Sequence, residues 1–146
     1  MTSINHMDDF VALEPFFRAI EGALSGLVDG DNFFELLADD VVFEYIITVP
    51  GYPRKVVGRS AVAELYRPYG DTFVLERCFD LAVHRDRESG VVVLEYACEG
   101  LVATTGATYA NRYISVVTIV DRKVTRWRDY LDPIAVFEAV GWPAHP

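Results

Sequence analysis

The spacing of apolar positions changes along the chain, from helical periodicity near the start to strand-like alternation in the second half. Early apolar residues recur every three or four positions, which predicts a helix capped by Asp8 or Asp9. These residues are Phe10, Leu13, Phe17, Ile20, Leu24, Leu27 and Val28. Because proline disrupts a helix interior, Pro15 predicts either a kink or a helix that starts near Glu14.

Three further elements and a turn are predicted before the middle of the chain. Residues 32–37 indicate a second short helix, and the apolar run 41–49 indicates a strand. The sequence Pro-Gly-Tyr-Pro at 50–53 is typical of a tight turn. A third helix is expected over 61–66, with Ser60 as its N-cap.

The second half predicts consecutive strands, because long β-branched and aromatic runs alternate with polar or glycine-containing turns. Strands are expected over 73–83, 91–102, 108–120 and 124–131. Asp132 then caps a short helix over 134–140, which Gly141 and Pro143 end. Helices segregated from the sheet indicate one α+β domain spanning 1–146. We expect a cone-shaped, curved antiparallel sheet whose concave face is covered by the N-terminal helices, with an apolar cavity at its wide end.

Composition narrows the classes of partner. A chain of 146 residues can bury roughly two thirds of its unfolded surface, which is enough for a real core. Nine Phe, eight Tyr and two Trp exceed the needs of a plain core and suit an aromatic-lined cavity. The net charge of −9 would repel a phosphate backbone, and no uncharged apolar run is long enough to span a membrane. The expected partner is therefore a hydrophobic small molecule, and neither nucleic acid nor a membrane.

Cysteine and histidine usage bears on compartment and cofactor. Cys78 and Cys98 have neither CxxC spacing nor a disulfide framework, which predicts free thiols in a reducing compartment. The N-terminus lacks the basic start and apolar core of a signal peptide, so a cytoplasmic location is expected. Histidines, cysteines and carboxylates form no cluster with ligand spacing. We therefore expect neither a metal nor another cofactor.

The last predicted strand supplies the main candidate for catalysis. Period-two alternation places two arginines, Arg126 and Arg128, on one face of this strand. The opposite face carries Thr125, Trp127, Asp129 and Leu131. A carboxylate in apolar company has a raised affinity for protons and suits acid–base work. The alternative is that Asp129 is a structural acid that binds backbone amides or a helix N-terminus.

Two neighbouring strands supply polar candidates for ligand binding. Tyr96 and Cys98 share one strand face, and a second set shares a face of the next strand: Tyr109, Asn111, Tyr113 and Ser115. Phenol and amide groups in a dry cavity can donate hydrogen bonds to a substrate carbonyl. Alternatively, the aromatic rings only fill a core, and Cys98 is a small core residue.

Three stretches resemble the nuclear transport factor 2-like superfamily, and within it the SnoaL-like and limonene-epoxide-hydrolase-like proteins. Residues 36–45 (LLADDVVFEY) are similar to its entry into the first strand, and residues 58–62 (GRSAV) to its start of the third helix. Residues 127–132 (WRDYLD) resemble the WRDYFD sequence near the end of the hydrolases. The resemblance extends over nearly the whole chain and implies a conical fold, usually assembled as a homodimer.

For the hydrolases, the resemblance implies that Asp129 matches the aspartate that activates water and that Trp127 lines the pocket. Their arginine and acid on a middle strand fall on Tyr96 and Cys98. Metal-free epoxide opening needs an acid to protonate the departing oxygen, and a thiol is a poor substitute. Epoxide hydrolysis is therefore disfavoured.

In the epoxide hydrolases, a tyrosine and an asparagine hold the hydrolytic water, and their positions fall on Phe43 and Tyr45. Other enzymes of the superfamily give a second comparison. The ketosteroid isomerase base would also fall near Tyr45, and the buried neutral acid of those enzymes near Ser115, so neither role transfers. SnoaL-like polyketide cyclases fit better, because they need one acid–base carboxylate and an aromatic-rich pocket.

The sequence thus predicts a cofactor-independent enzyme for a hydrophobic small molecule, of isomerase or cyclase type, with Asp129 as general base. Tyr45, Tyr96, Tyr113 or Asn111 would orient a substrate oxygen, and Cys98 and Trp127 would complete the binding site. Two alternatives are a binding protein without catalysis and an interaction module whose cavity is filled by its own side chains.

Overall fold

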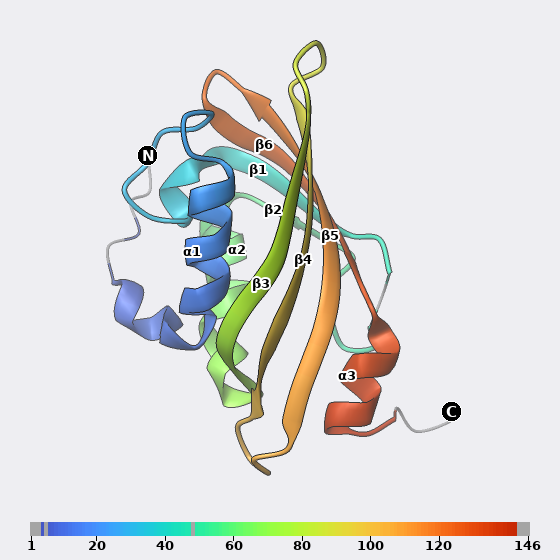
Figure 1. Ribbon diagram of the computed structural model, residues 1–146. Coiled ribbons are helices and arrows are strands. Elements are labelled where there is room, and N and C mark those ends of the chain that lie inside the picture. The colour runs from blue at the N-terminus through green and yellow to red at the C-terminus, as the bar shows by residue number, and fades with distance from the viewer. Residues whose placement is uncertain (1–3, 5, 48, 143–146) are drawn as a thin grey trace.

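A curved sheet of six strands wraps around helices α1 and α2 in the computed structural model, which describes residues 4, 6–47 and 49–142 (Figure 1). The α-helices are α1 (Glu14–Ala23), α2 (Arg59–Tyr66) and α3 (Pro133–Val140). Short 3-10 helices are η1 (Met7–Leu13), η2 (Phe34–Leu36) and η3 (Arg67–Asp71). The strands are β1 (Leu37–Tyr45), β2 (Lys55–Val57), β3 (Phe73–Asp86), β4 (Val91–Val102), β5 (Thr108–Val120) and β6 (Lys123–Leu131).

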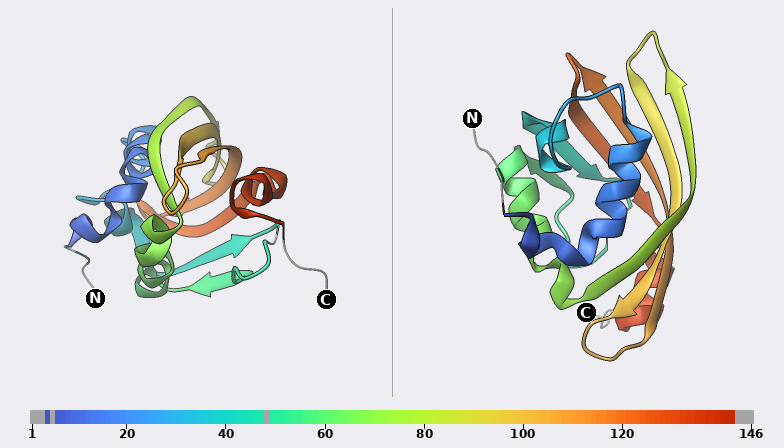
Figure 2. Two further views of the ribbon diagram at one scale, coloured as in Figure 1. Left: turned by 90° about the horizontal axis from the view of Figure 1, so that it is seen from below. Right: turned by 60° about the vertical axis from the view of Figure 1, so that its left-hand side comes forward.

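The sheet is mixed, with the strand order β2-β1-β6-β5-β4-β3. β1 and β6 run parallel, and all other neighbours are antiparallel. The α+β cone is confirmed, and the expected antiparallel pairing holds for every described pair of neighbouring strands except β1 and β6. Alternation within a strand does not encode which strand lies beside it, and the three-residue β2 is too short to leave a pattern. The sheet curves around the helices without closing on itself (Figure 2).

Proline decides where the first α-helix begins. α1 starts at Glu14, so that Pro15 lies in the first turn, where its missing N–H has no intrahelical partner to lose. The preceding η1 is a separate 3-10 helix with a non-helical conformation at Phe10. Of the two outcomes expected for Pro15, the structure has the later helix start.

Several boundaries before β3 differ from the prediction, including the end of α1 at Ala23 rather than near Val28. The helix expected over 32–37 is wrong: only the 3-10 turn η2 forms, and β1 already begins at Leu37 and ends at Tyr45. α2 begins at Arg59 rather than 61, and no side chain caps it. Gly58 at its N-cap has φ +100°, a conformation that favours glycine and ends the preceding strand, so Ser60 falls inside the helix.

The later elements follow the prediction closely. β4 and β5 span the predicted ranges 91–102 and 108–120. Asp132 caps α3, since its Oδ1 accepts a hydrogen bond from the Ile134 backbone N–H at 2.9 Å. Gly141 follows the helix as expected, and Pro143 lies outside the described residues.

The core is built largely from aromatic rings between the helices and the sheet. Phe17 of α1 stacks on Phe33 with ring centroids 4.5 Å apart. Trp127 of β6 is fully buried and stacks on Phe43 of β1 at 5.2 Å. Burying a side chain of this size stabilises the fold by roughly 1.5–3 kcal/mol. This packing fixes the orientation of β6 relative to β1.

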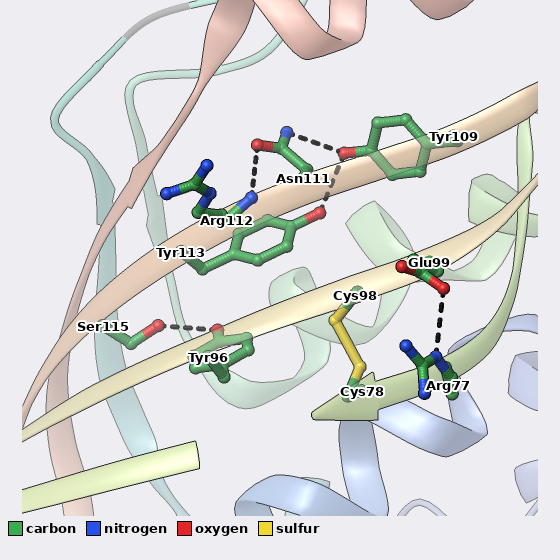
Figure 3. The surroundings of a disulfide bond; sticks show 10 residues. All are labelled: Arg77, Cys78, Tyr96, Cys98, Glu99, Tyr109, Asn111, Arg112, Tyr113 and Ser115. Carbon is green, nitrogen blue, oxygen red and sulfur yellow. Dashed lines mark hydrogen bonds and ion pairs between the residues drawn. A yellow bond between two sulfur atoms is a disulfide. The ribbon is translucent and has the colours of Figure 1, made fainter. Parts of the chain in front are cut away.

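The two cysteines form a disulfide, so the prediction of free thiols is wrong. Cys78 of β3 and Cys98 of β4 are direct cross-strand partners with Cα atoms 4.2 Å apart (Figure 3). Antiparallel pairing brings together positions 20 residues apart, which spacing alone does not reveal. The cysteine argument for a reducing compartment therefore no longer holds. Within the described ranges, no helix is both long and apolar enough to cross a membrane.

Candidate active site

The concave face of the sheet encloses a largely apolar pocket with a volume of about 100 Å³. Seven of the eight tyrosines of the chain line it: Tyr45, Tyr52, Tyr66, Tyr69, Tyr96, Tyr109 and Tyr113. The apolar wall includes Phe16 of α1, Phe73 of β3 and Val136 of α3. Among the described residues that line the pocket, Asp129 is the only carboxylate, and none is Lys, Arg or His. The pocket therefore presents one ionisable acid among phenols and hydrocarbon.

Alternation along β6 turns Asp129 into this pocket. Trp127 and Leu131 lie on the same side of the strand, with Trp127 fully buried. Arg126 lies on the opposite side and pairs with Glu44 at 2.7 Å. The prediction that the arginines of β6 point away from Asp129 is thereby confirmed for Arg126. No described cation forms a salt bridge with Asp129.

Two hydrogen bonds converge on one oxygen of the Asp129 carboxyl group. Ser115 Oγ donates to Oδ1 at 2.6 Å, and Trp127 Nε1 donates to the same atom at 2.8 Å. Ser115 is the direct cross-strand partner of Asp129, so the register of β5 and β6 creates this contact. The second oxygen, Oδ2, takes no hydrogen bond from the described residues. The residue is nevertheless only partly accessible, because the pocket that it lines is enclosed by protein.

Enclosure in the protein raises the pKa of Asp129 to about 6. Desolvation is the dominant cause, because burial disfavours the charged form. The hydrogen bonds from Ser115 and Trp127 oppose this rise, because they favour the carboxylate. A carboxyl group with this pKa has both forms populated near neutral pH, and it can accept and return a proton.

A hydrogen-bonded relay extends from Asp129 to Tyr96. Ser115 Oγ lies 2.8 Å from Tyr96 Oη (Figure 3). The same Ser115 Oγ lies 2.6 Å from the Asp129 carboxylate. A serine hydroxyl has one proton, which it gives to the carboxylate, so Tyr96 donates to Ser115. Burial and the charge of Asp129 raise the pKa of Tyr96 well above its usual value, which keeps the phenol neutral. The Tyr96 hydroxyl therefore holds Ser115 in place.

Tyr45 provides a second phenol close to the carboxylate. It is the residue of β1 that pairs in register with Asp129 across the parallel β1–β6 contact, and it lines the pocket. Burial, followed by the charge of Asp129, raises the pKa of Tyr45, and a hydrogen bond with Tyr66 opposes this. Tyr45 is thus a neutral hydrogen-bond donor beside the base.

The structure places the other predicted site residues in different ways. Tyr113 lines the pocket, and so does Cys98, although as one half of the disulfide. Trp127 and Asn111 are buried but are not among the residues that line the pocket. Trp127 acts on the site through its hydrogen bond to Asp129.

Asn111 fastens the end of β6 to β5. Its Nδ2 donates to the Asp132 carbonyl at 3.1 Å and to Tyr109 Oη at 2.9 Å. Its Oδ1 accepts from the backbone N–H groups of Asp132 and Arg112 at 3.2 and 2.7 Å. With all these contacts made inside the protein, Asn111 orients Tyr109 and the start of α3.

Sequence reasoning missed two pocket tyrosines outside the long strands, Tyr66 and Tyr69, and it considered Tyr52 only as part of a turn that could form a pocket lip. Tyr66 and Tyr69 are three residues apart at the junction of α2 and η3, and this helical spacing was a usable signal that they share a face. Tyr52 lies in the turn after β1, where no periodicity applies.

A curved, unclosed α+β sheet of this kind is also the fold of solved nuclear transport factor 2-like proteins. Residues 13–127 match the family model of the SnoaL-like domain, and the chain belongs to this family. The matched span ends two residues before Asp129, so the match itself says nothing about this carboxylate.

Three similar proteins illustrate the range of the family. YesE of Bacillus subtilis, an uncharacterised protein, is 33% identical over 113 residues, which cover 77% of each chain. The epoxide hydrolase EphG of Mycobacterium tuberculosis is 29% identical over 130 residues, covering 88% of this chain and 76% of EphG. A solved Bacillus subtilis structure with a provisional assignment as an isomerase has a TM-score of 0.72 and 28% identity, covering 94% of this chain and 96% of its own.

Proposed function

We propose that this SnoaL-like protein is a cofactor-independent acid–base enzyme of isomerase or cyclase type, acting on a small hydrophobic carbonyl compound. One observation carries the proposal. Asp129 is the sole carboxylate among the described pocket residues, its pKa is about 6, and its Oδ2 is left without a hydrogen bond from them. The other oxygen is held by Ser115 and Trp127, which fixes the orientation of the carboxylate.

The chemistry begins with removal of a proton from the carbon beside a carbonyl group. Asp129 Oδ2 takes the proton, the electron pair of the C–H bond forms the enolate C=C bond, and the carbonyl oxygen becomes negative. Tyr45 donates a hydrogen bond to this oxygen, where charge develops in the transition state. Where a C=C bond is conjugated with the enolate, return of the proton from Asp129 to the far carbon of that bond gives a double-bond isomer. Attack of the enolate carbon on a second carbonyl gives an aldol-type ring closure, and the alkoxide that forms takes the proton back from Asp129.

Epoxide hydrolysis receives less support from the same site. The positions that resemble the hydrolase arginine and acid are Tyr96 and Cys98. Cys98 has no thiol proton, because it is bonded to Cys78, and the Tyr96 proton is directed to Ser115. Neither group is placed to protonate a departing epoxide oxygen. The similarity to EphG therefore supports family membership more than a shared reaction.

A pocket that remains open also disfavours a purely structural role, which would leave it filled by its own side chains. A ligand-holding protein without catalysis is the remaining alternative, and exchange chemistry separates it from an enzyme. Enolisable ketones such as 2-heptanone are incubated with the protein in D₂O, and proton NMR follows loss of the signal from the hydrogens beside the carbonyl. The wild type is expected to accelerate exchange.

Asp129→Asn is expected to slow this exchange by roughly 10²–10⁴-fold, the usual contribution of a general base. Asp132→Asn is the matched control, because it removes an exposed carboxylate three residues away and asparagine still caps α3. Equal rates for wild type and Asp129→Asn would refute the proposal. Ketone binding without any exchange would instead assign the protein to the ligand-holding alternative.

A further inference from the structure

Besides the Tyr45–Tyr66 pair, two polar networks lie on the concave face, and only one of them includes the base. The first joins Tyr96 and Ser115 to Asp129. The second joins Asn111, Tyr109 and Tyr113 (Figure 3). The Tyr96 and Tyr113 rings stack with centroids 5.2 Å apart, yet their hydroxyl groups belong to different networks. The second network has no function in the chemistry described so far.

Counting protons in the second network leaves one donor unused. Asn111 Nδ2 donates to Tyr109 Oη at 2.9 Å, and Tyr109 Oη lies 2.8 Å from Tyr113 Oη. Two phenol protons are available, and the contact between the phenols uses one of them, whichever way it runs. Among the described residues no carboxylate or carbonyl oxygen accepts the other. Tyr69 also forms a hydrogen bond with Tyr113. It adds one phenol proton and one hydrogen bond to the count, so one proton of the three phenols still has no acceptor among the described residues.

This excess is a permanent feature of the folded protein near neutral pH. Burial is the main cause that raises the pKa values of Tyr109 and Tyr113, so both phenols keep their protons. Tyr109 is almost fully buried and is held from both sides, by the Asn111 amide and by the Phe73 ring stacked on it at 4.0 Å. A donor fixed in this way is preorganised for an acceptor oxygen that enters from the pocket.

The donor lies at a different part of the pocket from the base. Along β5, Ser115 is opposite Asp129, whereas Tyr113 is opposite Leu131. Tyr113 is thus two residues, or about 7 Å of strand, from Ser115, and its hydroxyl points further away, toward Tyr109 (Figure 3). Apart from Asp129 and the tyrosines, the pocket is lined by apolar side chains, among them Leu131, the cross-strand partner of Tyr113.

We propose that Tyr109 and Tyr113 form a second oxygen-binding subsite, and that the substrate carries two oxygen functions separated by an apolar segment. One is the carbonyl group activated beside Asp129, and this half rests on the proposed function. The other is a neutral acceptor, such as a ketone, ester or ether oxygen, bound by the phenols. A carboxylate is disfavoured, because none of the described residues that line the pocket is a cation and Asp129 would repel it. The cavity volume of about 100 Å³ is below the roughly 150 Å³ of an engineered cavity that binds benzene, so the substrate is a short chain or a ring that extends into the open mouth of the pocket.

Binding of probes that contain no removable proton tests the subsite by itself. Affinities for methyl benzoate, which has an acceptor carbonyl, and for ethylbenzene, its apolar counterpart, are measured by NMR titration. The double variant Tyr109→Phe/Tyr113→Phe is expected to bind methyl benzoate about tenfold more weakly, as befits one net hydrogen bond, and ethylbenzene equally well. The infrared carbonyl band of bound methyl benzoate should move to higher frequency. Tyr130→Phe is the control, because Tyr130 alone among the tyrosines lies outside the pocket lining.

A weakening shared by both probes, or none for methyl benzoate, would overturn the subsite, because the phenols would then contribute packing alone. The exchange rates of 2,6-heptanedione and 2-heptanone test the two-oxygen substrate. The dione should have the higher kcat/KM in the wild type, and the double variant should remove its advantage. If neither ketone exchanges while the methyl benzoate result holds, the proposed function fails and the subsite stands.

Discussion

Replacing Asp129 by asparagine should make the protein more stable while it abolishes proton transfer. The asparagine carbonyl oxygen can occupy the position of Oδ1 and keep both hydrogen bonds, from Ser115 and from Trp127. The amide nitrogen then faces the pocket, where Oδ2 lies in the wild type. The substitution therefore removes a buried charge with little change in shape or contacts.

The size of the effect follows from the pKa of Asp129. Folding raises this pKa from 3.8 to about 6. At 1.36 kcal/mol per unit, the folded protein loses about 3 kcal/mol of stability when the carboxyl ionises. The unfolded chain ionises near pH 4 and the folded protein near pH 6. The free energy of unfolding contributed by this group is thus highest below pH 4, falls between pH 4 and 6, and is lost above that range.

The assay is urea unfolding of wild type and Asp129→Asn from pH 4 to pH 8. The two proteins should have similar stability at pH 4, where both side chains are neutral. The variant should be more stable by about 3 kcal/mol at pH 8, a rise of roughly 6–12 °C in Tm for a domain of this size. Taking the difference between the two proteins cancels the titration of all other groups.

A difference that stays constant across this pH range would refute the reasoning, because Asp129 would then titrate alike in the folded and unfolded states. A variant that loses stability as pH rises would refute it more strongly, since ionised Asp129 would then stabilise the fold. Either result would also remove the observation on which the proposed function depends.

Two further perturbations act on the same site and on the sheet beside it. Ser115→Ala removes a hydrogen bond that favours the carboxylate, so the pKa of Asp129 should rise above 6. The acidic limb of the pH–exchange profile should then move to higher pH, and an unshifted limb would mean that Ser115 does not influence the base. Reduction of the Cys78–Cys98 disulfide opens a link between residues 20 apart and should lower the free energy of unfolding by about 3 kcal/mol. The urea midpoint should therefore be lower with dithiothreitol, and identical midpoints would argue against a stabilising disulfide.

The strands of the second half were predictable because their signal is local and long. β4 and β5 have 12 and 13 residues of β-branched and aromatic sequence, and their ends match the prediction. The inward direction of Asp129 was predictable for the same reason, since period-two alternation on β6 depends on no other strand. Tyr96 was also placed on the inner face, but its hydroxyl is committed to Ser115 rather than to a ligand.

What escaped prediction depends on register between strands that are distant in sequence. The pairing of Ser115 with Asp129, of Cys78 with Cys98, and of β1 with β6 is fixed only when the sheet assembles. Hydrophobic periodicity records which face a residue occupies and carries no information about its neighbour. The hydrogen bonds among Asp129, Ser115 and Tyr96 and the disulfide both arise from such neighbours.

The central position of β6 has a consequence for biosynthesis. The strand that carries Asp129 is the last of the sheet to leave the ribosome, yet it joins β1 on one side to β5 on the other. Until it is translated, β2–β1 and β5–β4–β3 are two fragments, each with an unpaired edge. Such edges favour aggregation of a nascent chain. When β6 pairs with both fragments, it completes the sheet and places Asp129 in the pocket in the same step.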